Sequence, residues 1–247
     1  MRIIISPAKK MVVDQDSFSP SGQPCHLNQA AEILQTLKQL SYDQAQKLWK
    51  TSDKLTRTSY EQLQLLDLTR PLSPAIFSYS GIQYQYMAPD VLSQAALEHL
   101  QETVRILSGL YGIVRPFDGI VPYRLEMGAR LQVNGAKNLY AFWGDRLYRA
   151  LCGHGPIVNL ASNEYSKTIA PYLQPADQMV DVVFAHVLDG KLKTRATPAK
   201  IARGEMVRFI AENQLTTIEE LTHFQSPTYT YDPRRSTNNR LVFVHES

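Results

Sequence analysis

Residues 2–6 of the chain are Arg-Ile-Ile-Ile-Ser, and Pro7 follows them directly. Three consecutive β-branched residues without polar alternation are typical of a strand that is covered on both faces. Proline then ends the strand, because it has no amide hydrogen to donate to a neighbour. Strands of this kind occur mainly in sheets that carry helices on both sides. The opening residues therefore predict an α/β fold built on a buried first strand.

The rest of the chain predicts further helices and strands by its apolar spacing. Helices are expected at residues 28–40, 41–49, 89–107, 139–151 and 198–213, the last capped by Thr197, and a shorter helix is expected after Thr217. Strands are expected at residues 76–79, 157–160, 179–187 and 241–244, and a surface loop at 14–28. We find no internal repeat and no long linker. The prediction is a single α/β domain over residues 1–247, with a mixed sheet and surrounding helices.

The composition excludes several classes of protein. The chain has 247 residues, of which 44% are hydrophobic and 20% charged, and 26 Lys and Arg stand against 23 Asp and Glu for a net charge of +3. These values exclude a disordered, collagen-like or coiled-coil protein. The longest apolar runs fall short of the roughly 18 residues of a membrane span, and the N-terminus lacks a signal-peptide core. We therefore expect a cytoplasmic protein without a membrane partner.

The cysteines and histidines are too few and too scattered for a recognisable metal site. There are two cysteines and six histidines, without the spacings of a zinc site or a disulfide framework. No metal ion, no cofactor and no protein partner is expected from the sequence.

The first polar motif is Ser-Pro-Ala-Lys-Lys at residues 6–10, directly after the predicted first strand. This turn would place Ser6 and Lys9 at the end of the sheet, where open α/β folds usually bind ligands. Two interpretations stay open: an anion-binding turn, and a strand-ending turn with solvated lysines.

The second motif covers residues 107–116, Leu-Ser-Gly-Leu-Tyr-Gly-Ile-Val-Arg-Pro, and continues through Pro-Tyr-Arg-Leu-Glu-Met-Gly at 122–128. Gly109 and Gly112 allow the backbone to approach a ligand closely, and exposed amides there can hold a phosphate. A helix that ends in such a hairpin has the geometry of a helix-hairpin-helix DNA module, although an ordinary helix C-cap is the alternative. The charges of Arg115, Arg124 and Glu126 favour a site, because a turn alone does not require them.

Two further motifs combine charge with backbone irregularity. Residues 159–167 contain Glu164 and Lys167, which form either a surface pair on a helix or part of a site loop. In residues 200–204 a glycine follows Arg203 inside a predicted helix, and Arg208 lies one turn later. Glycine costs a helix about 1 kcal/mol relative to alanine. Gly204 therefore serves either close packing against another backbone or close approach to a phosphate.

Several of these motifs together resemble the bacterial YaaA family of peroxide stress proteins, nearly from end to end. The resemblance is carried by Ile-Ser-Pro-Ala-Lys at 5–9, Ser-Asp-Lys-Leu at 52–55, the stretches at 107–116 and 122–128, Phe-Trp-Gly-Asp at 142–145, Asn-Leu-Ala-Ser at 159–162 and Ala-Arg-Gly at 202–204. It implies a cytoplasmic protein that protects DNA during hydrogen peroxide stress and is associated with lowering free intracellular iron. It also implies DNA binding through a helix-hairpin-helix element and a basic cleft in an unusual α/β fold.

On this resemblance, residues 108–114 are the candidate hairpin. The candidate DNA-binding residues are Lys9, Gly109, Tyr111, Gly112, Arg115, Arg124, Lys167, Arg203, Gly204 and Arg208. A basic cleft would bind phosphates through counterion release, without recognising a sequence. Tyr111 and Tyr123 could stack on the bases of a single-stranded or distorted partner.

The alternative is an enzyme that acts on a nucleobase or a phosphate in the same polar cleft. Glu126 or Glu164 would act as acid or base, with Lys9 or Lys167 as the electrostatic partner. The sequence offers these carboxylates beside basic residues, but no recognised nucleophile.

Overall fold

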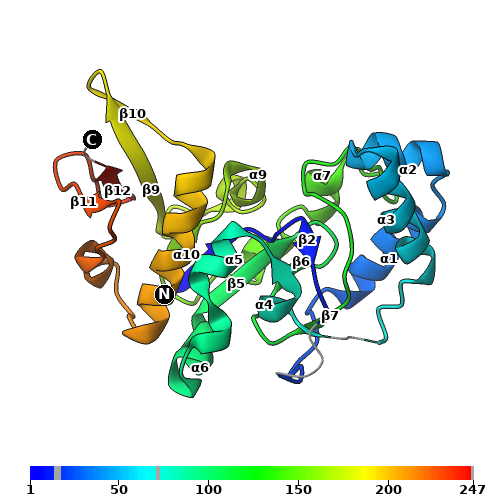
Figure 1. Cartoon of the computed structure of the whole chain (residues 1–247), viewed down its shortest axis with the longest axis horizontal. Helices are drawn as coiled ribbons and strands as arrows, with labels where there is room; N and C mark the ends of the chain where they lie inside the picture. Colours follow the sequence, from blue (N-terminus) through cyan, green and yellow to red (C-terminus); the bar gives the residue numbers. More distant parts are fainter. Residues whose placement is uncertain (14–17, 71–72, 246–247) are drawn as a thin grey trace.

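A mixed β-sheet lies at the centre of the molecule (Figure 1). The computed structural model describes residues 1–13, 18–70 and 73–245, and within them the sheet has the order β11-β12-β9-β8-β1-β5-β6, with β10 paired to β9. Its eight described strands are β1 (Arg2–Ile5), β5 (Val104–Ser108), β6 (Gly112–Val114), β8 (Ile157–Leu160), β9 (Met179–Leu188), β10 (Lys191–Lys193), β11 (Thr230–Tyr231) and β12 (Arg240–His245). The mixed α/β fold is confirmed.

Helices and two small strand pairs surround this sheet. The described helices are α1 (Leu27–Lys38), α2 (Tyr42–Trp49), α3 (Asp53–Leu65), α4 (Ala75–Ser78), α5 (Ile82–Met87), α6 (Gln94–Thr103), α7 (Leu139–Trp143), α8 (Arg146–Arg149), α9 (Asn163–Ser166) and α10 (Ala196–Glu212). The small pairs join β2 (Lys10–Met11) to β4 (Tyr79–Ser80) and β3 (Ser73–Pro74) to β7 (Gly119–Ile120). In Figure 1, α1, α2 and α3 gather on the right, and β9 to β12 lie on the left.

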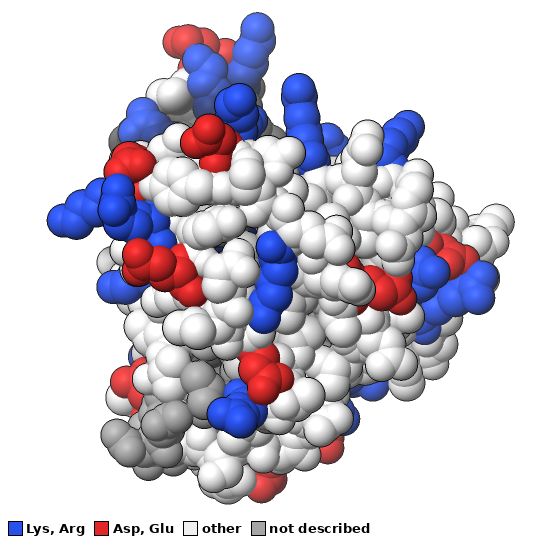
Figure 2. All heavy atoms as spheres, turned by 90° about the vertical axis from the view of Figure 1, so that its right-hand side faces the viewer, with Lys and Arg blue, Asp and Glu red and all other residues white. Residues whose placement is uncertain are grey.

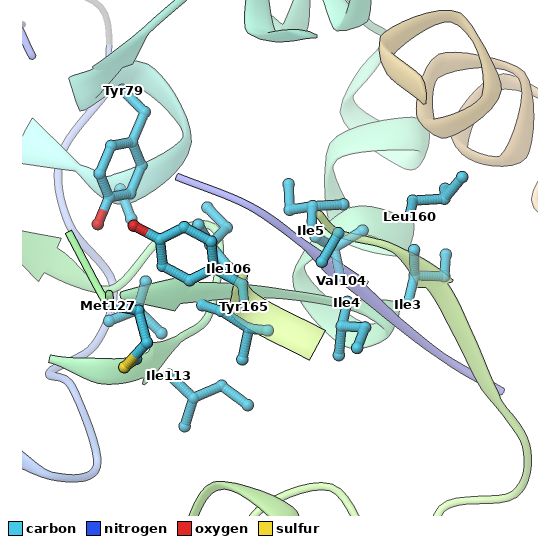
Figure 3. Close-up of a cluster of buried hydrophobic side chains, with 14 of the residues drawn as sticks. Ile3, Ile4, Ile5, Tyr79, Val104, Ile106, Ile113, Met127, Leu160 and Tyr165 are labelled. Carbon is cyan, nitrogen blue, oxygen red and sulfur yellow. The ribbon is translucent and has the colours of Figure 1, made fainter. Parts of the chain in front are cut away.

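The first strand is buried in the middle of the sheet, as the sequence predicts. Ile3, Ile4 and Ile5 have no exposed surface, and β1 runs parallel to β5 on one side and to β8 on the other. Figure 3 shows the three isoleucines among apolar side chains of both neighbours, including Val104, Ile106 and Leu160. The burial of such side chains stabilises the fold by about 1.5 to 3 kcal/mol each.

The order of the strands reverses at β1. The chain leads from β1 to β5 on one side and, after the β5–β6 hairpin, returns to place β8 on the other side of β1. The boundary between β1 and β8 is therefore a switch point, and ligands of open α/β sheets bind beyond the carboxyl ends of the strands at such points. In this chain those ends are followed by Ser6 and Ser162.

Most of the predicted helices and strands are confirmed. Ser41 caps α2 in a capping box with Gln44, and the strands β8, β9 and β12 begin and end within a residue or two of their predicted bounds. In the predicted loop, residues 14–17 lie outside the described residues, and residues 18–26 contain no helix.

The largest error of the sequence-based prediction concerns residues 89–114. The predicted helix at 89–107 ends at Thr103, and Val104–Ser108 continues as the strand that pairs with β1. The candidate helix-hairpin-helix at 108–114 is therefore wrong, because these residues form the turn and second strand of a β-hairpin. The apolar residues from Leu97 to Leu107 keep helical spacing across the junction of α6 and β5. Pairing with β1 nevertheless makes residues 104–108 a strand.

Smaller errors occur where short apolar runs carry no decisive period. Residues 76–79 mostly form helix α4 rather than a strand, and the helix predicted at 139–151 is divided into α7 and α8 at Gly144. Helix α10 begins at Ala196, so Thr197 does not cap it. Thr217 and Glu220 do exchange hydrogen bonds, but the element at this place is a short 3-10 helix at Glu219–His223, which includes Glu220, instead of an α-helix.

Candidate functional site

A cavity of ≈ 410 Å³ opens at the switch point. Ser6 and Ser162, which follow β1 and β8, line it and are joined by hydrogen bonds. The Ser6 hydroxyl accepts from the Ser162 amide at 2.8 Å and donates to the Ser162 hydroxyl at 3.2 Å. The sheet therefore positions two hydroxyl groups at the place where α/β folds bind ligands. We call this cavity the switch-point cavity.

Two further cavities adjoin it, of ≈ 750 and ≈ 90 Å³. All three share Lys9 and Arg124 in their linings. The larger one lies against α1, α2 and residues 128–132, and the smaller one lies against α1 and α3. We call the three together the cleft, and the larger of the two added cavities the outer cavity.

The lining of the cleft is strongly basic. Among the described residues only two acidic ones line it, Glu126 and Glu164, whereas the basic residues are Lys9, Lys10, Lys47, Lys50, Arg124, Arg130, Lys200 and Arg203. The whole chain is nearly balanced in charge, at 26 to 23. The excess of positive charge is therefore concentrated in this cleft.

The two carboxylates in the cleft already have partners. Glu126 Oε1 lies 3.3 Å from Lys9 Nζ and 3.4 Å from Arg124 Nη2, and the Glu126 side chain is 19% exposed. Glu164 accepts a hydrogen bond of 2.8 Å from the Gly128 amide, so it holds the loop at 122–128 beside α9. Neither carboxylate cancels the charge of Lys10, Lys200 or Arg203.

Several hydrogen-bond donors around the cleft lack an acceptor. In the part of the chain that the structure describes, the buried atoms without a partner include Gln83 Nε2, Arg124 Nε and Arg203 Nε, all from residues that line the switch-point cavity. Trp49 Nε1, from the outer cavity, is a fourth. Burial also lowers the pKa of Arg203. Buried donors without acceptors are unfavourable, so their concentration here indicates a ligand that supplies acceptor atoms.

A group of tyrosines forms one wall of the switch-point cavity. The Tyr84 hydroxyl donates to the Ser6 carbonyl at 3.0 Å. The Tyr123 hydroxyl lies 2.7 Å from Ser108 Oγ and 3.0 Å from the Tyr79 hydroxyl. Burial raises the pKa of Tyr123 to about 12, and it raises the pKa values of Tyr79 and Tyr84 well above their usual range. Of these three, Tyr84 and Tyr123 line the cavity, and the partly exposed Tyr123 offers aromatic surface to a ligand.

We expect the buried tyrosines to make the fold sensitive to alkali. Between a pKa of about 10 in the unfolded chain and about 12 in the folded protein, the folded state retains a proton on Tyr123 that the unfolded state has lost. The contribution of Tyr123 to the free energy of unfolding is complete below a pH of about 10. Above that pH it falls by up to about 1.4 kcal/mol per pH unit. Urea unfolding at several pH values measures this slope.

The variant Tyr123→Phe is the control for this prediction, because it removes one titrating group and keeps the ring. Its slope above pH of about 10 should be shallower than that of the wild type. Equal slopes in the two proteins would contradict the assignment of the slope to Tyr123.

Three of the predicted DNA-binding residues line the cleft: Lys9, Arg124 and Arg203. The predicted carboxylates Glu126 and Glu164 lie with them. The structure thus brings together residues from four separate motifs of the sequence. Lys9, with a side chain that is 71% exposed, reaches all three cavities.

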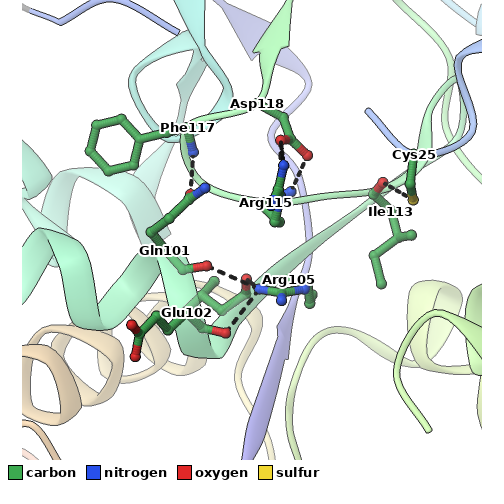
Figure 4. A network of polar contacts seen from close by, with 9 residues as sticks. Cys25, Gln101, Glu102, Arg105, Ile113, Arg115, Phe117 and Asp118 are labelled. Carbon is green, nitrogen blue, oxygen red and sulfur yellow. Dashed lines mark hydrogen bonds and ion pairs between the residues drawn. The ribbon is translucent and has the colours of Figure 1, made fainter. Parts of the chain in front are cut away.

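Arg115 lies apart from the cleft, contrary to the sequence-based prediction. Figure 4 shows it paired with Asp118, whose carboxylate is 3.1 Å from the Arg115 guanidinium and accepts from the Arg115 amide. It follows the edge strand β6, and it lines none of the three cavities. Arg115 therefore forms an ion pair with the buried carboxylate of Asp118, and this pair closes the turn at residues 115–118.

Lys167 and Arg208 also lie outside the three cavities. Lys167 is exposed after α9, while Arg208 pairs with Glu212 one turn further along α10 at 2.8 Å. The structure therefore does not bring these two candidates together with Lys9, Arg124 and Arg203.

The remaining four candidates are buried and offer no surface to DNA. Tyr111 is 1% exposed, and its hydroxyl accepts from the Val121 amide, so it cannot stack on a base. Gly109 and Gly112 belong to the buried β-hairpin. A Cβ at Gly204 would lie 2.3 Å from the Gln83 carbonyl oxygen, so this glycine serves the packing of α10 on α5. Of the two interpretations of Gly204, close backbone packing is confirmed.

The surface of the α1–α3 side carries mixed charge. Figure 2 shows basic and acidic side chains next to one another on this face, with wide uncharged areas between them. The described residues of this face therefore form no continuous basic surface, in contrast to those that line the cleft.

Sequence reasoning missed several cleft residues. Ser162 follows a predicted strand, as Ser6 does. A prediction that these two strands pair would have placed Ser162 beside Ser6. Lys47 and Lys50 have the usual appearance of solvated lysines at the end of a helix, and Gln83 lies in an aromatic stretch without a period. No pattern in the sequence marks these three residues.

Comparison with known proteins identifies the family. The family model described as peroxide stress protein YaaA matches residues 1–235. The chain belongs to the YaaA family. Among its relatives, a UPF0246 protein of Lactiplantibacillus plantarum is 59% identical over 247 residues, with 100% of both chains covered. A UPF0246 protein of Lacticaseibacillus paracasei is 60% identical over 245 residues, with 99% of both chains covered, and one of Agathobacter rectalis is 42% identical over 244 residues, with 98% covered.

No helix in the described residues has the length and apolar character to cross a membrane. Within the same residues, no three or more His, Cys, Asp or Glu side chains are grouped so that they could hold a metal ion.

Proposed function

We propose that this protein acts in the peroxide stress response by binding DNA in the cleft and thereby protecting it. The observation that carries the proposal is the lining of the cleft, in which eight basic residues stand against two acidic ones in the part of the chain that the structure describes. Phosphate groups are the anions that DNA presents along its whole length. Basic side chains bind them with release of counterions, and this contribution does not depend on sequence.

The outer cavity is the part of the cleft that fits the phosphate backbone best. Lys47, Lys50 and Arg130 line it, and all three are exposed, so their charges can reach a large polyanion. Contacts of this kind position a nucleic acid without recognising its bases. We therefore expect binding that weakens steeply as salt is added.

The effect on free intracellular iron, which the family resemblance implies, stays a prediction. The cleft contains two carboxylates among its basic residues, and each has a partner in the protein. We therefore assign the cleft to an anion and assign no iron chemistry to it.

An enzymatic function in the same cleft is the second candidate. It is favoured by Glu126, which is held between Lys9 and Arg124 beside an indented cavity of ≈ 410 Å³. A partly buried carboxylate beside two basic groups can take part in proton transfer. The hydroxyls of Ser6 and Ser162 bond to each other, and no described contact gives either one a histidine or a carboxylate as a base.

The double variant Lys47→Gln/Lys50→Gln tests DNA binding. We expect its affinity for a short DNA to fall at least about tenfold at moderate salt, and the slope of log affinity against log salt to become shallower by about two. Fluorescence anisotropy over a series of salt concentrations measures both quantities.

The matched control is Lys167→Gln/Lys193→Gln, which removes the same charge from two exposed lysines outside the three cavities. It should bind DNA within about twofold of the wild type. If both double variants lose affinity equally, the net charge and not the cleft governs binding.

A further inference from the structure

We propose that the switch-point cavity is a pocket for one nucleotide, which it holds by the phosphate at its donors and by the base against its tyrosine wall. The inference rests on the proposed function, because it names the unit of nucleic acid that the inner part of the same cleft takes. The ligand chemistry is a nucleoside phosphate. Such a unit can come as a free mononucleotide or as a nucleotide turned out of a DNA strand.

The unpartnered donors require a ligand that is rich in acceptors. Gln83 is only 7% exposed, yet its side-chain amide makes no described hydrogen bond. Arg124 and Arg203 each bury an Nε–H without a partner in the lining of the same cavity. An unpartnered buried donor costs about 1 to 3 kcal/mol. Three such donors around one cavity are explained if phosphate and base carbonyl oxygens accept from them.

The charge of the lining selects an anion. Glu126 is occupied by Lys9 and Arg124, and Glu164 by the Gly128 amide. Lys10, Lys200 and Arg203 also line the cavity and make no ion pair with a described acidic residue. The cavity therefore keeps an uncompensated positive charge, which a phosphate group would neutralise.

The size and the walls of the cavity require more than a bare phosphate. A volume of ≈ 410 Å³ lies in the range of small-molecule sites, about 300 to 1,000 Å³. Tyr84, Tyr123 and Tyr165 line it; Tyr84 and Tyr165 are only 4% and 6% exposed, whereas Tyr123 is partly exposed. An exposed tyrosine ring stacks on bases without strong preference for one base, and Tyr123 is the ring that can do so here. An anion with an attached planar group fills the cavity, and this description fits a nucleotide.

The decisive experiment is isothermal titration calorimetry of the full chain with nucleoside monophosphates. AMP, GMP, CMP and TMP are the probes, and adenosine and inorganic phosphate represent the two halves of a ligand. We expect the monophosphates to bind with dissociation constants of about 10 to 500 μM, at least tenfold more tightly than either half. Monophosphates that bind no better than inorganic phosphate would overturn the proposal.

Two variants connect the binding to the donors. Gln83→Met keeps the length of the side chain and removes the amide, and Arg203→Met removes the guanidinium. Each should weaken binding of the monophosphates at least tenfold. Gln83→Met should also keep or raise the midpoint of thermal unfolding, because it removes an unpartnered buried donor. Wild-type affinity in both folded variants would refute the role of these donors.

The control Lys47→Gln/Lys50→Gln separates this inference from the proposed function. It changes the outer cavity only, so it should keep the affinity for monophosphates while it loses affinity for DNA. If monophosphates fail to bind while DNA binding depends on Lys47 and Lys50, the nucleotide pocket is refuted and the proposed function stands. If monophosphates bind and DNA does not, the proposed function fails and the pocket takes a free nucleotide.

The source of the nucleotide is tested by competition. A single-stranded oligonucleotide with one 2-aminopurine should become brighter on binding if that base is turned out of its stack into the pocket. An excess of the bound monophosphate should then reverse the signal. Binding of the monophosphate without any such signal identifies a free nucleotide as the ligand.

Discussion

The replacement of Gly112 by alanine is expected to lower the free energy of unfolding by about 4 kcal/mol. Gly112 has a φ of 72°, and a Cβ there would lie 2.6 Å from Leu147 Cδ2 and 2.8 Å from two ring atoms of Trp143. The left-handed backbone costs an alanine about 1 to 2 kcal/mol, and overpacking adds about 1 to 3 kcal/mol. Urea unfolding of the purified variant measures the loss.

Gly135 supplies the matched control, because it also has a positive φ, 81°, but no atom lies within 4 Å of its Cβ position. Gly135→Ala should therefore cost only the backbone strain of about 1 to 2 kcal/mol. If the two variants lose the same stability, the packing of the β5–β6 hairpin on α7 and α8 is not as described. A DNA-binding hairpin would instead lose DNA affinity and keep its stability.

The second large effect is expected for Gly204→Ala, at about 2 kcal/mol of destabilisation or more. Alanine normally stabilises a helix interior by about 1 kcal/mol relative to glycine. In α10 the new methyl group would meet the Gln83 carbonyl oxygen at 2.3 Å and the Met87 amide nitrogen at 3.0 Å. Both atoms are backbone, so no change of rotamer relieves the contact, and the two helices must separate.

Arg208→Ala, one turn along the same helix, is the comparison for Gly204→Ala. It removes only a surface pair with Glu212, which contributes about 0.3 to 0.5 kcal/mol. Thermal unfolding of both variants gives the contrast. A stable Gly204→Ala variant with reduced DNA affinity would favour the phosphate interpretation of this glycine over the packing interpretation.

The central sheet could be predicted in large part, because its strands have local signals. Ile3, Ile4 and Ile5 mark a strand that is buried on both faces, and β8, β9 and β12 are apolar runs bounded by turns. Residues 104–108 could not be assigned in this way. Their apolar spacing continues that of α6, and only the pairing of Ile106 with Ile5, about 100 residues earlier, makes them a strand.

The candidate site could be predicted where a motif follows a strand and not where the fold alone brings residues together. Ser6 and Lys9 follow β1, and Arg124, Glu126 and Arg203 belong to charged motifs that contain glycine or proline, so sequence reasoning found all five. Arg115 has the same appearance, but its partner Asp118 lies three residues on and satisfies it. Gln83 lines the cavity because α5 packs on α10, and no pattern in the sequence predicts that contact.

The central position of β1 has a consequence for synthesis of the protein. Arg2 pairs with Ile157, so during synthesis β1 waits for a partner strand that is made about 155 residues later. At about 5 to 20 residues per second, the three isoleucines of the nascent chain stay without β8 for roughly 8 to 30 seconds. Until then the switch point between Ser6 and Ser162 does not exist. We therefore expect the ligand cavity to be among the last parts of the newly made protein to form, and β1 to be a site for chaperones until β5 and then β8 pair with it.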